Sequence, residues 1–249
     1  MPHPALASTA HRPWPLPDRP WVLSMAWHDL LFLHWPVPAA ALQAHLPPGL
    51  ELETFAGSAW LGVVPFRMVR TRWRFLPPVP TAGTFDELNV RTYVRAGGRS
   101  GVWFFSLDAA SRLAVEGARL GFGLPYFRAR MACRVEHGNV EYRSERHDRR
   151  GPPAVFAAGW SQRGGGAVAA PGSLEQFLVE RYALFAWRRG RLVCGEIAHA
   201  PWRLAPAEVR IDACDMGRIL GLALPPAPVS ALAAAALDVA AFAPRPAPA

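Results

Sequence analysis

A carboxylate and a guanidinium share one face of a predicted strand. The odd positions from 87 to 95 are Glu87, Asn89, Arg91, Tyr93 and Arg95, and the even positions between them are mostly apolar. Alternate side chains of a strand point to opposite faces, so these polar groups lie together. In a pocket, Glu87 could act as a general acid or base and Arg91 could hold a ligand carboxylate. Asn89 and Tyr93 would add hydrogen bonds. The alternative is a buried Glu87–Arg91 ion pair that only satisfies the interior.

Other metal-binding or nucleophilic side chains are spaced less favourably. Cys194, Glu196 and His199 lie two and three positions apart, which on a strand splits them between faces. His28 and His34 are six residues apart on one predicted strand and therefore on one face, where paired histidines are more often packed or hydrogen-bonded than bound to metal. No Gly-x-Ser-x-Gly motif is present. We therefore expect no metal site, no cofactor and no nucleophilic hydrolysis.

The polar face belongs to a strand–turn–strand–helix–strand segment, residues 85–131. Gly97-Gly98 predicts a two-residue hairpin turn after the first strand. The returning strand, residues 101–107, is apolar on both faces, which is typical of a central strand. Asp108 is expected to cap the first turn of the helix that follows, and Gly123 is expected to end it.

Strand patterns outnumber helix patterns in the rest of the chain. Strands are predicted at residues 21–35, 59–75, 126–136, 140–146, 154–161, 192–202, 209–211 and 237–242, and short helices at residues 38–46, 173–185 and 216–222. With 26 prolines, this pattern favours an α+β fold that is mostly β. The absence of repeats and linkers favours one domain over residues 21–245, preceded by a proline-rich arm over residues 1–20 that is extended or partly ordered.

Composition limits the classes of function. The net charge is +8, and all 27 basic residues are arginine, so the chain contains no lysine. These arginines are scattered and accompany no nucleic-acid-binding motif, which disfavours nucleic acid as a partner. The Ala-rich run at residues 229–243 is too short to span a membrane. Three distant cysteines disfavour a disulfide framework and fit a reducing cytoplasm.

Long motifs along the chain resemble a known family. The chain is similar to the YqjF-like family of uncharacterised bacterial proteins, over roughly residues 22–245, in the motifs LLFLHWPV, LPPGLELETFAGSAWLGVVPFRM, NVRTYV, GVWFFSLDAASRLAV, LPYFRARM, GSLEQFLVERYALF and HAPWRLAPAEV. That family is in turn similar, more distantly, to acetoacetate decarboxylase. The resemblance implies an antiparallel meander folded into an open or conical β-barrel, with a few short helices outside it and a pocket within.

The same resemblance places the decarboxylase site on this chain. After the helix that contains Arg119, the decarboxylase has two lysines, one of which forms a Schiff base; here Tyr126 stands in the place of a lysine. With no lysine in the chain, and no free amine on arginine, a side-chain Schiff base is excluded. Glu87 matches a pocket glutamate of the decarboxylase. His28 lies near the position of its carboxylate-binding arginine, so His28 and Arg119 join Asn89 as candidate ligand-binding residues.

Three classes of function remain open. The first is a barrel that binds a small carbonyl or carboxylate compound without turnover. The second is an enzyme that acts on a small oxo or hydroxy acid by acid–base chemistry through Glu87, with Arg91 or His28 holding the carboxylate. The third is a structural or interaction module with an arginine-rich surface. A pocket that contains Glu87 would favour the first two, and a filled barrel the third. The decarboxylase relatives form oligomers, so a homo-oligomer is expected by analogy.

Overall fold

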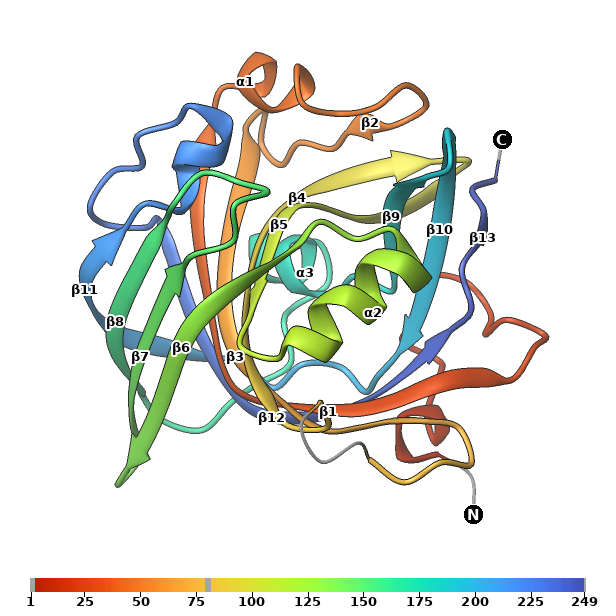
Figure 1. Cartoon of the computed structure of the whole chain (residues 1–249), viewed down its shortest axis with the longest axis horizontal. Helices are drawn as coiled ribbons and strands as arrows, with labels where there is room; N and C mark the ends of the chain where they lie inside the picture. Colours follow the sequence, from red (N-terminus) through yellow and green to blue (C-terminus); the bar gives the residue numbers. More distant parts are fainter. Residues whose placement is uncertain (1–2, 79–81, 249) are drawn as a thin grey trace.

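The computed structural model describes residues 3–78 and 82–248, and in these residues thirteen strands form one sheet (Figure 1). The elements in chain order are η1 (Pro4–Leu6), β1 (Trp21–Val37), α1 (Ala39–Gln43), β2 (Glu51–Leu52), β3 (Ala59–Trp73), β4 (Phe85–Ala96), β5 (Arg99–Ala109), α2 (Arg112–Phe122), β6 (Tyr126–Glu136), β7 (Asn139–Arg146), β8 (Val155–Gln162), α3 (Leu174–Val179), β9 (Ala183–Arg188), β10 (Arg191–Ala198), β11 (Ala205–Cys214), η2 (Met216–Leu220), β12 (Ser230–Phe242) and β13 (Arg245–Pro246).

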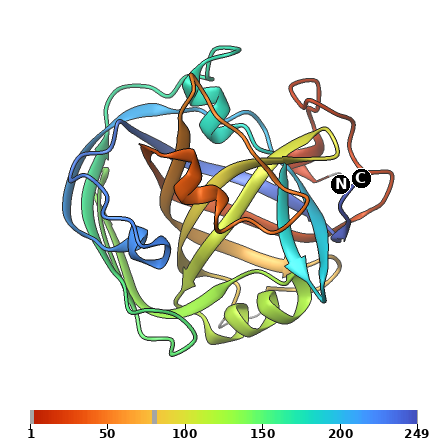
Figure 2. The ribbon, with the colours of Figure 1, turned by 90° about the horizontal axis from the view of Figure 1, so that it is seen from above.

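Strand pairings roll the sheet into two rings that share strands. The first ring contains β12, β1, β3, β4, β5, β9 and β10, and it closes where β10 pairs with β12 and β5 pairs with β9. The second ring adds β6, β7, β8 and β11, which join the shared strands at β5 and β12. Figure 2 shows the two rings as two lobes side by side. The fold class predicted from the sequence, a mostly β, open barrel with a few short helices, is confirmed.

Each ring encloses its own hydrophobic cluster, and the shared strands contribute to both. On β1, Leu31, Leu33 and Trp35 pack in the cluster of the second ring. Leu30 and Phe32, which point the other way, pack in the cluster of the first ring. A strand that is buried on both faces is apolar at nearly every position, which is why this part of β1 lacks the usual polar alternation.

The helix after β5 begins later than the sequence predicts. β5 continues to Ala109, and Ser111 caps α2, with its Oγ accepting a hydrogen bond from the amide of Ala114 at 3.3 Å. The prediction that Asp108 is the cap was wrong. Asp108 is fully buried in the sheet, where its Oδ1 accepts a hydrogen bond from Nε of Arg146 at 2.7 Å. Gly123 ends α2 in the left-handed conformation, with φ of 72°, as predicted.

The helix predicted at residues 173–185 is half helix and half strand. Ser173 caps α3 as expected, but the helix ends at Val179, and residues 183–188 form β9 between β10 and β5. The apolar spacing suits a helix throughout, but the pairing with two strands that are distant in sequence overrides that local preference. The two last predicted strands are longer than expected, at residues 205–214 and 230–242.

Residues 3–20 lie against the strands of the first ring. His3 shares a hydrogen bond of 2.8 Å with the hydroxyl of Ser24 on β1. Arg12 donates to the carbonyl of Ile197 on β10 at 2.6 Å, and Trp14 donates to the carboxylate of Glu196 at 2.8 Å. The arm is therefore bound along the outside of the ring. No helix in the described part of the chain is long and apolar enough to cross a membrane.

Candidate functional site

The first ring encloses a cavity of about 170 Å³. Its wall is mostly aliphatic and aromatic, from β1, β3, β5, α2, α3 and β10. The cavity-lining side chains with a polar atom are Trp27, Glu87, Asn89, Arg91, Tyr126, Arg181, His199 and Trp202. An apolar cavity with a few convergent polar groups is the usual form of a small-molecule site. Three successive residues on the predicted polar face of β4 therefore line the cavity: Glu87, Asn89 and Arg91.

Glu87 is the buried acid of the cavity. The residue is 2% exposed, and its Oε2 accepts a hydrogen bond from the hydroxyl of Tyr126 at 2.8 Å. Burial raises the pKa of Glu87 to about 8, although the tyrosine hydrogen bond opposes that shift. The carboxyl is therefore largely protonated at neutral pH. In that state it can donate a hydrogen bond to a ligand oxygen as well as accept the bond from Tyr126.

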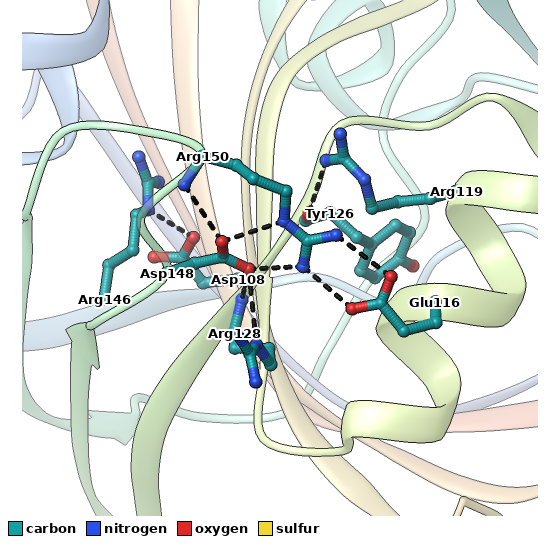
Figure 3. A network of polar contacts seen from close by, with 8 residues as sticks. All are labelled: Asp108, Glu116, Arg119, Tyr126, Arg128, Arg146, Asp148 and Arg150. Carbon is teal, nitrogen blue, oxygen red and sulfur yellow. Dashed lines mark hydrogen bonds and ion pairs between the residues drawn. The ribbon is translucent and has the colours of Figure 1, made fainter.

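The Glu87–Tyr126 pair is held by hydrogen bonds to its backbone. Arg119 of α2 donates to the carbonyl of Tyr126 at 2.8 Å (Figure 3). From the second ring, the hydroxyl of Tyr142 donates to the carbonyl of Glu87 at 2.7 Å. Arg119 is thus placed behind Tyr126, outside the cavity wall, rather than in the cavity. Fixed backbone positions on both partners give the acid a defined orientation toward the cavity.

Arg91 lines the cavity without a carboxylate partner among the described residues. One Nη donates to the carbonyl of Leu178 in α3 at 3.0 Å, and the guanidinium lies 5.5 Å from the ring centre of Phe32 and 5.8 Å from that of Tyr93. The alternative of a Glu87–Arg91 ion pair is therefore not observed. A cation in a mostly apolar wall without a neutralising acid is favourably placed to bind an anion.

Asn89 and Tyr93 occupy different environments. Asn89 lines the cavity between Glu87 and Arg91, and its buried Oδ1 has no hydrogen-bond partner among the residues that the structure describes. Tyr93 is fully buried in the surrounding hydrophobic cluster, where its hydroxyl shares a hydrogen bond of 2.6 Å with Nε2 of His34. Burial and the charge of Arg91 hold the pKa of His34 well below its usual range, so that imidazole is neutral.

His28 and His34 point to opposite faces of β1, contrary to the prediction from their spacing. Asp29, between them, has a φ of 51°, and the register between β1 and β3 shifts on its C-terminal side. A bulge of this kind changes which face the following side chains occupy. His28 consequently lies in a surface hollow beside Pro4 and Ala5 rather than in the cavity.

The sequence interpretation did not place four polar side chains of the cavity wall, namely Trp27, Arg181, His199 and Trp202. Arg181 lies in the segment predicted to be helical, and its guanidinium is already paired with Glu53. Trp27 and Trp202 stack at 5.9 Å, although they come from opposite ends of the chain. His199 is fully buried, and burial lowers its pKa to about 4. The polar pattern of β4 carries no information on these residues, because long-range pairing alone places them opposite it.

The described residues hold no cluster of three or more His, Cys, Asp or Glu side chains that could bind a metal ion. The polar groups of the cavity are instead a protonated carboxyl, an amide, two guanidinium groups and aromatic N–H or O–H groups. Such a set can bind and orient a small oxygen-containing anion, and can exchange a proton with it.

The rolled sheet of two rings has the fold of acetoacetate-decarboxylase-like proteins. The chain is similar to the acetoacetate decarboxylase of Legionella pneumophila, with a TM-score of 0.63 and 15% identity, covering 95% of this chain and 92% of that one. It is also similar to the enduracididine biosynthesis enzyme MppR complexed with pyruvate, with a TM-score of 0.63, 15% identity, and coverage of 92% and 91%. A third similar structure is an acetoacetate decarboxylase-like enzyme of Sphingomonas wittichii, with a TM-score of 0.61 and 16% identity, covering 92% of each chain.

The chain belongs to the family described as "Uncharacterized conserved protein (COG2071)", whose model matches residues 24–239. It is 41% identical over 210 residues to the "Uncharacterized protein YqjF" of Bacillus subtilis, covering 84% of this chain and 86% of that protein. The resemblance deduced from the motifs is therefore confirmed. The likeness to the solved structures, at these low identities, establishes the fold alone.

Proposed function

We propose that the chain binds a small carbonyl- or carboxylate-containing compound in the cavity of the first ring. Arg91 takes the carboxylate of the ligand, and the protonated Glu87, oriented by Tyr126, donates a hydrogen bond to a ligand oxygen. No side-chain Schiff base takes part, because the chain has no lysine. The observation that carries the proposal is the partly buried guanidinium of Arg91, which faces an apolar cavity and has no ion-pair partner in the described chain.

The solved relatives support this class of ligand. One of them is named an acetoacetate decarboxylase, and MppR is complexed with pyruvate, which is a small oxo acid. The cavity is also of a suitable size: a cavity of about 150 Å³ can hold one benzene molecule, and this one is about 170 Å³. The first ring contains this cavity and is not filled by side chains. A filled ring would have favoured a purely structural module.

Arg91→Met is expected to weaken the binding of small carboxylates by roughly ten- to a hundredfold, because charge-assisted hydrogen bonds contribute about 1.5–3 kcal/mol. Methionine keeps an unbranched apolar side chain against Phe32 but removes the charge. Isothermal titration calorimetry with a panel of small oxo and hydroxy acids would measure the loss. Native mass spectrometry of freshly purified protein, with a denatured control, would detect a retained ligand and show whether Arg91→Met loses it.

Arg95→Met is the matched control for the Arg91 variant. Arg95 lies on the same face of β4, but its side chain is exposed outside the cavity, where it pairs with Glu53. Ligand affinity should be the same as in the wild type. Equal affinities for Arg91→Met and the wild type would contradict the assignment of the carboxylate to Arg91.

A second candidate is an enzyme that uses Glu87 for acid–base chemistry on an oxo acid, and the pKa of about 8 favours it. In deuterated water, an ionised Glu87 would remove a proton from the carbon beside the carbonyl of 4-oxopentanoate. The protonated carboxyl would then exchange that proton with the solvent and return a deuteron to the same carbon of the enolate. Proton NMR would show loss of that signal, faster toward pH 8 and slower by at least about a hundredfold in Glu87→Gln. If hydrogen–deuterium exchange of 4-oxopentanoate with the wild-type protein is no faster than in buffer alone, the protein does not catalyse this proton transfer. The proposal of ligand binding would then stand alone.

A further inference from the structure

The cation and the acid of the cavity stand at different levels of the ring. On β4, Glu87 pairs with Phe66 of β3, and Arg91 pairs with Gly62. Four residues of strand separate the two positions, which corresponds to roughly 13 Å between their Cα atoms. The bulge beside Val90 and Arg91 lies on β5, where Phe105 is the extra residue, and the register of β4 with β3 is unbroken over this span. A ligand that touches both groups must therefore extend along the strand.

The two side chains also have different partners. The carboxyl of Glu87 meets Tyr126 at the start of β6, beside the end of α2. The guanidinium of Arg91 reaches toward α3, where it bonds to the carbonyl of Leu178 and lies beside the ring of Tyr93, two residues further along β4. The cavity thus has an acid-binding end and a separate hydrogen-bonding end.

Apolar side chains line the cavity at the levels between these ends. Phe66 stands opposite Glu87, and Val64 stands opposite Asn89 on β3. Leu30 and Phe32 of β1 continue this wall. Asn89 is the one polar side chain that β4 places in the wall at this middle level, and its Oδ1 has no partner in the described chain.

We infer that the cavity takes an elongated monocarboxylate, with its acid group at Arg91, a carbonyl or hydroxyl oxygen at Glu87, and an apolar chain between them. This inference rests on the proposed function and narrows its ligand class. A cavity slightly larger than one that holds benzene accommodates roughly six to ten non-hydrogen atoms. Short 2-oxo acids carry the carboxylate and the carbonyl on adjacent carbons, so they reach only one end.

Three seven-carbon acids test the arrangement by calorimetry at neutral pH: 6-oxoheptanoate, 2-oxoheptanoate and heptanoate. The first two are isomers that differ only in the position of the carbonyl. We expect 6-oxoheptanoate to bind at least about tenfold more tightly than the other two, because it alone fills both ends. Arg91→Met should weaken the binding of all three acids.

The Glu87→Leu/Tyr126→Phe double variant removes the hydrogen-bonding end and leaves no unpaired partner. It should bind the three acids about equally, and its continued binding of heptanoate would show that the fold is intact. Glu87→Gln, whose amide can still donate a hydrogen bond, should retain the preference for 6-oxoheptanoate.

Preferential binding of 2-oxoheptanoate would overturn the two-ended arrangement but leave the proposed function in place. So would equal affinities for the two oxo acids, or binding of only shorter acids from the panel. If no carboxylate binds, the proposed function itself fails. Retention of the 6-oxo preference in the double variant would show that Glu87 is not the hydrogen-bonding end.

Discussion

Glu87→Gln is expected to raise the free energy of unfolding by on the order of 4 kcal/mol more at pH 8 than at pH 5. The reason is the protonation of the buried carboxyl. Its pKa is 4.5 in the unfolded chain and about 8 in the native protein. Between these values the native state binds a proton that the unfolded state has released, so the stability of the wild type falls as the pH rises.

The sign and the window follow from that difference. The contribution of Glu87 is complete below pH 4.5 and is lost at about 1.4 kcal/mol per pH unit until the native carboxyl ionises near pH 8. Glutamine is neutral throughout and lacks this loss. His199, with its pKa lowered to about 4, acts in the opposite direction at lower pH. Because His199 is common to both proteins, its effect cancels in the difference between them.

Denaturant unfolding of both proteins without added ligand, across this pH range, measures the effect. Glu145→Gln on β7 removes a half-exposed surface carboxylate and controls for the loss of one negative charge. A difference between Glu87→Gln and the wild type that stays constant with pH would mean that Glu87 is ionised in the native state. It would then be an acceptor rather than a donor, and the hydrogen-bonding end of the cavity would need a ligand N–H or O–H.

The sequence predicted the part of the cavity wall formed by β4 because this strand has no bulge between its cavity-lining residues. From Glu87 to Asn89 the strand alternates without interruption, and its period of two is the property that a sequence displays directly. The same reasoning failed on β1. There, a single left-handed residue, Asp29, shifts the side-chain faces between His28 and His34. Aspartate is enriched at positive φ, but most aspartates do not adopt it, so the residue type alone does not mark this position as a bulge.

The other errors have a common physical origin in contacts between distant segments. Aspartate is a good capping residue by type, but Asp108 instead forms a buried ion pair with Arg146, 38 residues later, and stays in the sheet. The segment that contains Arg181 has helical spacing, but β5 and β10 convert its second half into β9. The opposite wall of the cavity, including Trp202, was beyond prediction for the same reason. Local patterns determine faces and turns, whereas the closure of a ring depends on pairings that no short window contains.

Arg146→Met is expected to lower the free energy of unfolding by about 3–5 kcal/mol, the usual effect of removing one partner of a buried ion pair. Figure 3 shows the ion pair of Arg146 with Asp108. Their side chains are 1% and 0% exposed. Arg146 also donates to the hydroxyl of Ser106 at 2.9 Å and lies 4.6 Å from the ring centre of Phe127. Without Arg146, Asp108 remains buried as an unpaired acid. Its Oδ2 has no hydrogen-bond partner in the described chain even in the wild type, so neither carboxylate oxygen would then be compensated by Arg146.

The pH dependence identifies the cause of this destabilisation. Burial already raises the pKa of Asp108 to about 6, against the opposing charge of Arg146. Loss of that charge raises the pKa further, so the stability of Arg146→Met should fall as the pH rises above 3.8, and over a wider range than in the wild type. Arg130→Met, which removes a 78% exposed arginine from β6, is the control and should change stability by less than about 1 kcal/mol.

The Asp108→Leu/Arg146→Met double variant separates the unpaired charge from lost packing. If the buried acid is the cause, the double variant should recover at least about 2 kcal/mol relative to Arg146→Met, because an apolar pair can replace a buried ion pair at little loss. No recovery would attribute the effect to the contacts with Ser106 and Phe127. Asp108 follows Leu107 of the cavity wall, and Leu107 pairs with Tyr126. The double variant should therefore also restore any ligand affinity that Arg146→Met loses.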